Sequence, residues 1–175
     1  MHIVLRFVPL LALGLGCVAA SAADDRPTLL GVARDWSAYQ AQTDNGQVCY
    51  ALSKPKTTEP KKATRDPIYV LISDWPGRHV RGEFEIVPGY QYKDGEPAVA
   101  QAGAAKVQFF TRNDGGAGSA WVSDPGDEVK LLEAMRGSGS LVVSGVSQRG
   151  THTRDTYSLN GISAMLDKVH AACGS

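Results

Sequence analysis

Charge of one sign is the most obvious thing that this sequence lacks. It holds 18 basic and 18 acidic residues, so its formal net charge at pH 7 is zero. Proteins that bind nucleic acid or anionic membranes through their overall charge carry a marked basic excess. The global charge therefore points to no class of partner, and we expect no nucleic-acid-binding function.

Recognisable cofactor and metal motifs are also missing. No Walker, Rossmann or EF-hand pattern occurs, and the histidines follow neither H-x-H nor H-E-x-x-H spacing. Two cysteines without a neighbouring His or Cys cluster do not complete a tetrahedral metal shell. We therefore expect neither a cofactor nor a metal ion.

A long apolar run is found only at the N-terminus. It extends from Phe7 to Ala20, follows the basic Arg6, and ends in the small residues Ala20-Ser21-Ala22. This three-part plan is typical of a secretory signal peptide with an A-x-A cleavage site. We expect residues 1–22 to be removed, which leaves a periplasmic or secreted chain with 17 basic and 18 acidic residues.

Two alternatives exist for this segment. A membrane anchor needs roughly 20 apolar residues, whereas this run is interrupted by Pro9 and followed by a cleavable sequence. A lipoprotein would use Cys17, but the preceding Gly14-Leu15-Gly16 is unlike a lipobox. We expect residues 23–175 to form a single exported β-rich domain without a transmembrane anchor, with a polar lead-in through Thr28.

Cleavage would leave two cysteines, Cys49 and Cys173, near opposite ends of the mature chain. In an oxidising compartment such a pair is most simply a disulfide, and the alternatives are two free thiols or a metal pair. In the chain-entropy model, closing so long a loop stabilises the folded state by roughly 4 to 5 kcal/mol.

Short alternating segments separated by turn residues fill most of the mature chain. Asn45-Gly46 predicts a type I′ hairpin turn. Glu83–Val87 and Lys106–Thr111 alternate, with Phe84 and Phe109 among the inward residues. Further strands are expected from near Ala33 and at Gln47–Ser53, Ile68–Ile72, Leu141–Ser147 and Thr153–Leu159. The pattern predicts a mainly β fold, a β-sandwich or partly open barrel of about six to nine antiparallel strands.

One internal helix and one C-terminal helix interrupt this pattern. The internal helix follows an N-cap at Asp124 and stops at Gly137, with Val129, Leu132 and Met135 as its expected apolar face. The second spans about Ile162–Ala172, and its apolar stripe runs on to Cys173. The members of that stripe are Ile162, Met165, Leu166, Val169 and Cys173.

Strand alternation places Cys49 opposite Val48, Tyr50 and Leu52, which we assign to the main core. Cys49 would then point to the outer face of its strand. We therefore expect the disulfide to hold the C-terminal helix over that outer face.

Catalytic residues are hard to identify. His152 and Asp155, with Ser144 or Ser158, could form a hydrolytic set, but no G-x-S-x-G elbow accompanies them and hairpin alternation explains the same residues. A periplasmic hydrolase using His152 and Asp155 is the alternative to a non-enzymatic protein.

Other titratable residues have structural explanations. Asp35, Asp66 and Asp74 would be paired carboxylates only if folding brought them together, and turn or cap roles are commoner for aspartate. His170 is explained by the dipole at its helix C-terminus.

The best candidate for recognition is the segment between Lys54 and Pro67, which has no periodicity and is expected to be an exposed loop. Its local positive charge could meet an acidic partner, although a solvated loop is the simpler interpretation. Trp75, in Trp75-Pro76-Gly77, is the tryptophan most expected to be exposed. The candidate partner-binding residues are Lys54, Lys56, Lys61, Lys62, Arg65 and Trp75.

Several short motifs together resemble the invasion-associated locus B family of alphaproteobacterial exported proteins. They are Cys49–Ser53 after the Asn-Gly turn, Arg65-Asp66-Pro67, Asp155–Leu159, Gly161-Ile162-Ser163 and the terminal Cys173. The resemblance covers about Gly31 to Cys173. It implies a small, mainly β envelope or secreted protein, linked in some pathogenic members with entry into host cells, and it supplies no catalytic residues.

We therefore expect a non-enzymatic exported protein that mediates cell-surface or host-cell interaction by binding an unidentified protein, glycan or envelope component. A structural role in envelope integrity is a further alternative to the hydrolase.

Export is directly testable. N-terminal sequencing of the protein recovered from the periplasm or the medium should begin at Ala23 or Asp24, because the small residues before Ala23 form the cleavage site. Recovery of an intact Met1 would exclude cleavage.

Overall fold

The computed structural model describes residues 26–61 and 63–174, so the expected signal peptide and Lys62 lie outside the described residues. The described strands join one antiparallel sheet of eleven strands, in the order β1-β2-β3-β5-β6-β9-β8-β7-β10-β11-β4. The predicted fold class is confirmed, with more strands than expected. Among the described residues, no helix is both long and apolar enough to cross a membrane.

The strands are β1 (Thr28–Ala33), β2 (Trp36–Thr43), β3 (Gly46–Ser53), β4 (Thr57–Glu59), β5 (Tyr69–Trp75), β6 (Val80–Val87), β7 (Ala98–Ala102), β8 (Ala105–Asp114), β9 (Ala117–Val122), β10 (Ser140–Val146) and β11 (His152–Ser158). The helices are the 3-10 turn η1 (Pro76–Arg78), α1 (Pro125–Gly137) and α2 (Ile162–Cys173).

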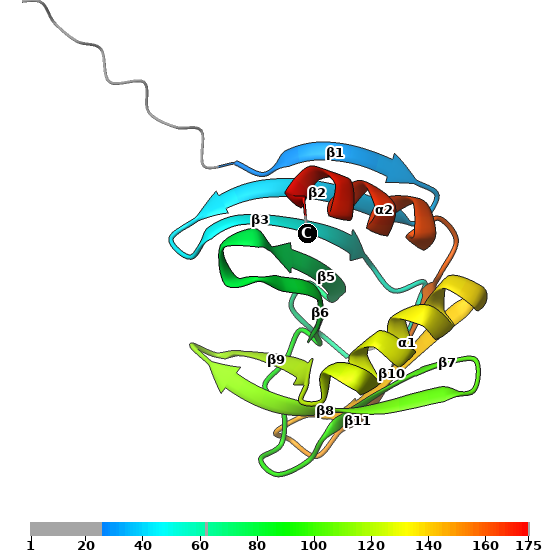
Figure 1. Ribbon diagram of the computed structural model, residues 1–175. Helices are drawn as coiled ribbons and strands as arrows, with labels where there is room; N and C mark the ends of the chain where they lie inside the picture. The colour runs from blue at the N-terminus through cyan, green and yellow to red at the C-terminus, as the bar shows by residue number, and fades with distance from the viewer. Residues whose placement is uncertain (1–25, 62, 175) are drawn as a thin grey trace, which may run out of the picture.

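The sheet is strongly curled, and in Figure 1 β1, β2 and β3 lie above while β8 and β11 lie below. Segments from near its two ends come into contact at one corner. The Trp36 side-chain Nε1–H at the start of β2 donates to the Ser158 carbonyl at the end of β11, at 2.9 Å. Nearby, the Asp35 N–H donates to the Asn160 carbonyl at 3.2 Å. These are loop and side-chain bonds in place of a strand ladder, so the architecture is a partly open barrel.

A glycine makes the close approach at this junction possible. Gly161, which precedes α2, has φ +95°, and a Cβ there would lie 2.0 Å from the Ala33 carbonyl oxygen. Any other residue would push α2 away from the turn between β1 and β2.

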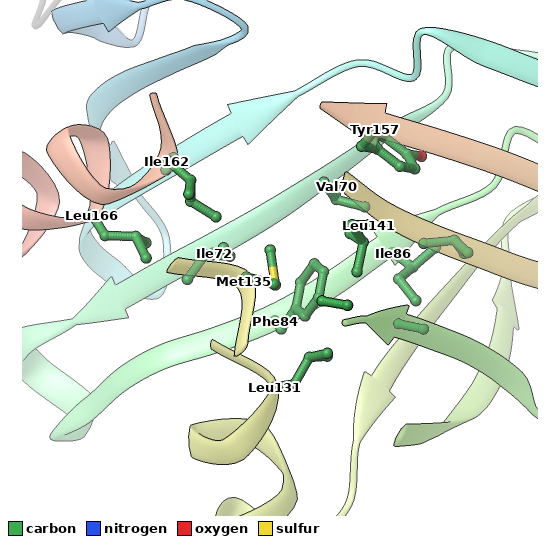
Figure 2. Packing of buried hydrophobic residues seen from close by; sticks show 14 of the residues in the cluster. Val70, Ile72, Phe84, Ile86, Leu131, Met135, Leu141, Tyr157, Ile162 and Leu166 are labelled. Atoms are coloured by element: carbon green, nitrogen blue, oxygen red, sulfur yellow. The ribbon is translucent and has the colours of Figure 1, made fainter. Parts of the chain in front are cut away.

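Both helices pack into the concave face of the curled sheet. α1 lies against β6, β7, β8 and β9, and α2 against β1, β2, β3 and β5. Figure 2 shows Leu131 and Met135 of α1 pointing toward side chains of β5 and β6, among them Phe84. Phe84 also meets Phe109 edge-to-face, with ring centroids 5.3 Å apart. The inward positions expected for Phe84 and Phe109 are confirmed.

The predicted limits of both helices are confirmed, but the predicted apolar face of α1 is partly wrong. Asp124 caps α1, its carboxylate accepting from the Gly126 N–H at 2.7 Å. The apolar stripe of α2 is buried as predicted. In α1, however, Val129 is 55% exposed while Leu131 is fully buried, so the expectation for Val129 was wrong. α1 is rotated about its axis relative to the expected orientation, because Leu131 and Met135, one turn apart, face the sheet.

Four strands were missed, namely β1, β4, β7 and β9. Two of these, β1 and β4, lie where a lead-in or a loop was expected. β1 begins at Thr28, where a polar lead-in was expected, and its Leu29 and Val32 are exposed. β4 lies inside the expected loop, bonded to β11 at the sheet edge. Neither β1 nor β4 alternates between buried and exposed residues. These two strands form because they pair with a neighbouring strand, and not because one face is buried.

The disulfide between Cys49 and Cys173 is confirmed, with the two Cα atoms 5.8 Å apart. Its expected position was wrong. Cys49 is fully buried in the core, and α2 packs on the concave face of the sheet, while Tyr50 and Leu52 are half-buried on the convex face. Alternation shows which residues share a face of a strand, and not which face the core occupies.

Replacing both cysteines by alanine should lower the free energy of unfolding by about 2 to 5 kcal/mol, because the long closed loop no longer restricts the unfolded chain. Urea denaturation measures this loss. Reductant should lower the midpoint of the parent protein to a similar degree and leave that of the variant unchanged. A parent midpoint that is insensitive to reductant would contradict a stabilising disulfide.

Candidate functional site

The convex face of the sheet has a hollow where β6 and β9 separate. The two strands pair at Glu85 with Trp121 and at Ile86 with Ala120. At Phe84 the ladder ends, and the Phe84 N–H donates instead to Glu128 Oε1 of α1 at 2.7 Å. Burial raises the pKa of Glu128, and this hydrogen bond opposes the rise. The separation leaves a hollow of about 570 Å³, which is within the size range of ligand sites.

Two aromatic side chains form one wall of this hollow. Phe110 of β8 and Trp121 of β9 are cross-strand partners, with ring centroids 5.8 Å apart. Because alternation directs Phe109 inward, Phe110 points outward and is 44% exposed. An outward phenylalanine beside a tryptophan departs from the polar exterior usual on the solvated face of an antiparallel sheet.

Arginines surround this aromatic pair. Arg78, Arg81 and Arg112 line the hollow together with Phe110 and Trp121, and we call this set the arginine–aromatic hollow. All three arginines are exposed. Arg112 has no ion-pair partner among residues 26–61 and 63–174. Glu83 and Glu128 also line the hollow, and Glu83 pairs with Arg78. The hollow thus offers apolar contact and the positive charge of Arg112, which is unpaired within the described residues.

Trp75 holds one side of the hollow in place. Its Nε1–H donates to Glu83 Oε2 at 3.0 Å, and the Arg78 guanidinium lies over its ring, 5.2 Å from the centroid. Arg78 also pairs with Glu83 at 3.5 Å. Trp75 is half-buried and acts as a support for Arg78, in contrast to its expected exposure.

The expected basic residues do not gather with Trp75. Lys54 lies beyond the end of β3, next to the start of β5, whereas Trp75 ends β5. Lys54 and Lys61 are exposed, and Lys56 pairs with Asp35. That pair lowers the pKa of Asp35. Lys54 and Lys56 therefore lie beyond the end of β3, away from Trp75.

Arg65 was expected on an exposed loop, and this expectation was wrong. Its side chain is 5% exposed and pairs with Asp155 of β11, whose side chain is 3% exposed. Arg65 Nη1 donates to Asp155 Oδ2 at 3.0 Å and to the Pro88 carbonyl at 3.2 Å. Burial raises the pKa of Asp155, and the hydrogen bonds from Arg65 oppose that rise. The pair joins segments 90 residues apart in the chain.

The structure does not assemble the proposed hydrolytic set. His152 is exposed and Asp155 is buried, because residues three apart in a strand point to opposite faces. Asp155 is also engaged by Arg65. The other candidate carboxylates are separated as well: Asp66 is exposed on a loop, and Asp74 is buried in β5.

One interaction of Asp74 was not anticipated. Its Oδ2 lies 2.6 Å from Nδ1 of His170, and its Oδ1 accepts from the Gly82 N–H at 2.9 Å. The pair joins the last turn of α2 to β5 and β6, next to the disulfide. His170 thus has a specific partner in addition to the helix dipole proposed from sequence.

The residues of the arginine–aromatic hollow, apart from neighbouring Trp75, were missed by the sequence analysis. One signal was available: Phe110 follows Phe109 in an alternating strand, so one of the two must point outward. The contributions of Arg78 and Arg112 could not be seen, because Arg78 belongs to η1 and Arg112 to β8, which are distant in the sequence.

Comparison with known proteins gives a likeness of fold. No protein-family model matches the chain, and neither does any curated protein. Among solved structures, it is similar to invasion associated protein B from Bartonella henselae, with a TM-score of 0.55 at 16% sequence identity. The match covers 83% of this chain and 98% of the other. The two proteins share a fold.

Removing one partner of the Arg65–Asp155 pair should lower the free energy of unfolding by about 3 to 5 kcal/mol, because it leaves an unpaired buried charge. Arg65→Met and Asp155→Leu should each show this loss in urea denaturation, and the double variant should recover much of it. Lys56→Met, at the exposed Lys56–Asp35 pair, is the matched control and should change stability far less. Equal small losses for all three single variants would contradict a structural role for Arg65–Asp155.

Proposed function

We propose that this chain is an exported, non-enzymatic binding protein of the invasion-associated type that contacts a cell-surface or envelope protein through the arginine–aromatic hollow. The observation that carries the proposal is the exposed Phe110, paired with the half-buried Trp121 in a hollow that three arginines also line.

The composition of the hollow supports a protein partner. Tryptophan and arginine are the residues most enriched where truncation weakens protein–protein binding most strongly. Phe110 exposes apolar surface that gains free energy only when a partner removes it from water. Arg112, which is unpaired within the described part of the chain, favours a partner that places an acidic group beside its apolar contact.

Two further features support export. The N-terminal segment has the plan of a signal peptide, and a structural disulfide persists in oxidising compartments such as the periplasm or the exterior. The shared fold with a protein named for its association with invasion is consistent with a role at the cell surface. The exposed Lys54 and Lys61 would supply a secondary basic contact.

Site-specific photo-crosslinking tests this function. A photoreactive amino acid at position 110 should capture a protein partner in the native envelope or on target cells. The same amino acid at position 32 should not, although Val32 is 61% exposed and therefore more accessible than Phe110. Mass spectrometry of the crosslinked species measures the difference.

Substitution provides the second arm of this test. Phe110→Ser with Arg112→Ser should reduce the captured amount by more than about tenfold, since a central contact contributes about 2 kcal/mol or more. Val32→Ser is the control for loss of an exposed apolar group. Identical capture at positions 32 and 110, or capture that survives both hollow substitutions, would contradict the proposal.

A further inference from the structure

A second hollow lies where four loops of the sheet meet, and it shares no residue with the arginine–aromatic hollow. Its lining comes from segments 63–66, 89–91 and 147–153 and from Gly116 in the turn between β8 and β9. We call it the four-loop hollow. Its volume is about 470 Å³. In Figure 1 two of these loops, the green one before β7 and the orange one before β11, lie side by side below β8.

Backbone hydrogen bonds hold these loops together. The Asp66 N–H donates to the Gly89 carbonyl at 3.0 Å, and the Gln148 N–H donates to the Gln91 carbonyl at 2.8 Å. Gly89 has φ +73°, and a Cβ there would lie 2.3 Å from the Asp66 carbonyl oxygen, so only glycine permits this approach. The hollow is therefore organised before any ligand enters, which lowers the entropic cost of binding.

The side chains at the floor of the four-loop hollow are polar, and they already have partners within the protein. The Arg65 guanidinium, neutralised by Asp155, lies over the Tyr90 ring, 5.7 Å from its centroid. The Tyr90 hydroxyl and Thr153 Oγ1 are hydrogen-bonded at 2.6 Å. Burial raises the pKa of Tyr90, so this hydroxyl keeps its proton. The floor thus offers fixed dipoles and no free charge.

The rim carries neutral side chains with unused hydrogen-bonding capacity. Thr64, Gln91, Gln148 and Thr151 line the hollow, and within the described part of the chain their side chains have no hydrogen-bond partner. An amide or a hydroxyl both donates and accepts. These four side chains can therefore satisfy a ligand that itself donates and accepts at several adjacent positions.

Charge at the rim is balanced. Arg149 and Asp66 have opposite signs, and both line the hollow. Selection of an anion would require several charge-assisted donors aimed at one point, whereas here the buried cation is already paired with Asp155. The electrostatics of the hollow therefore favour an uncharged, hydroxyl-rich ligand over a phosphate or a carboxylate.

We propose that the four-loop hollow binds a neutral saccharide unit of a glycan, held by Thr64, Gln91, Gln148 and Thr151 above the Arg65–Asp155 floor. This site is independent of the protein contact at the arginine–aromatic hollow, so either can fail without the other.

The test uses the complete disulfide-bonded protein on an array of neutral oligosaccharides that contain glucose, galactose, mannose or N-acetylglucosamine. Each sugar that binds on the array is then titrated into the protein and its binding is followed by NMR. Inorganic phosphate is titrated in the same way as the ionic probe. At least one neutral sugar should bind saturably and shift the backbone amides of residues 91, 148 and 151. Phosphate should leave these amides unchanged at the same concentrations.

Substitutions then locate the site. Gln148→Ala and Thr151→Val should each weaken the sugar about three- to tenfold, the value of one neutral hydrogen bond. Both positions are exposed on a turn, so the fold should be retained. Gln108→Ala removes an exposed glutamine of β8 that does not line the hollow and should leave binding unchanged.

Three results would overturn the proposal. The first is the absence of saturable binding by any neutral sugar on the array. The second is equal weakening by Gln108→Ala and Gln148→Ala. The third is a response of the same amides to phosphate at lower concentrations than to any sugar.

Discussion

The packing of two helices into the concave face of one curled sheet is the constraint on which the rest of this structure depends. The apolar stripes of α1 and α2 need a surface to bury them, and the sheet supplies it by curling until β2 meets β11. The disulfide and the Asp74–His170 pair both hold the last turn of α2 in that position. Because side chains such as Leu131 and Leu166 fill the interior, it is not available to a ligand. The two hollows accordingly lie outside this interior, one on the convex face and the other among four loops.

The buried Arg65–Asp155 pair explains why two separated motifs belong together. Arg65-Asp66-Pro67 and Asp155–Leu159 were among the segments that carried the resemblance to the invasion-associated locus B family. In the structure they meet, because the guanidinium of the first pairs with the carboxylate of the second. A buried ion pair of this kind is expensive to break at one partner only. The motifs thus reflect the architecture, in agreement with a fold shared with invasion associated protein B at 16% identity.

Local signals predicted local structure well, and their failures have one cause. The Asp124 cap, the stripe of α2 and the inward Phe84 and Phe109 all depend on residues close in sequence. The side of the sheet that buries Cys49 depends instead on where α2 returns, many residues later. Arg65 appeared exposed because its partner Asp155 is 90 residues away in the chain. Phe110 was detectable as an outward aromatic residue, but the arginines that line its hollow come from η1, β6 and β8.

The sequence by itself determined the β-rich class, the helix limits and the cysteine pair, because alternation, capping and the count of thiols are properties of short segments or of composition. Only the tertiary structure decided which face of each strand is buried, which charges are paired and where hollows form. Those outcomes depend on the curl of the sheet, and the curl arises from contacts between residues far apart in the chain. The candidate sites belong to this second group, since each is built from several strands or loops that meet only after folding.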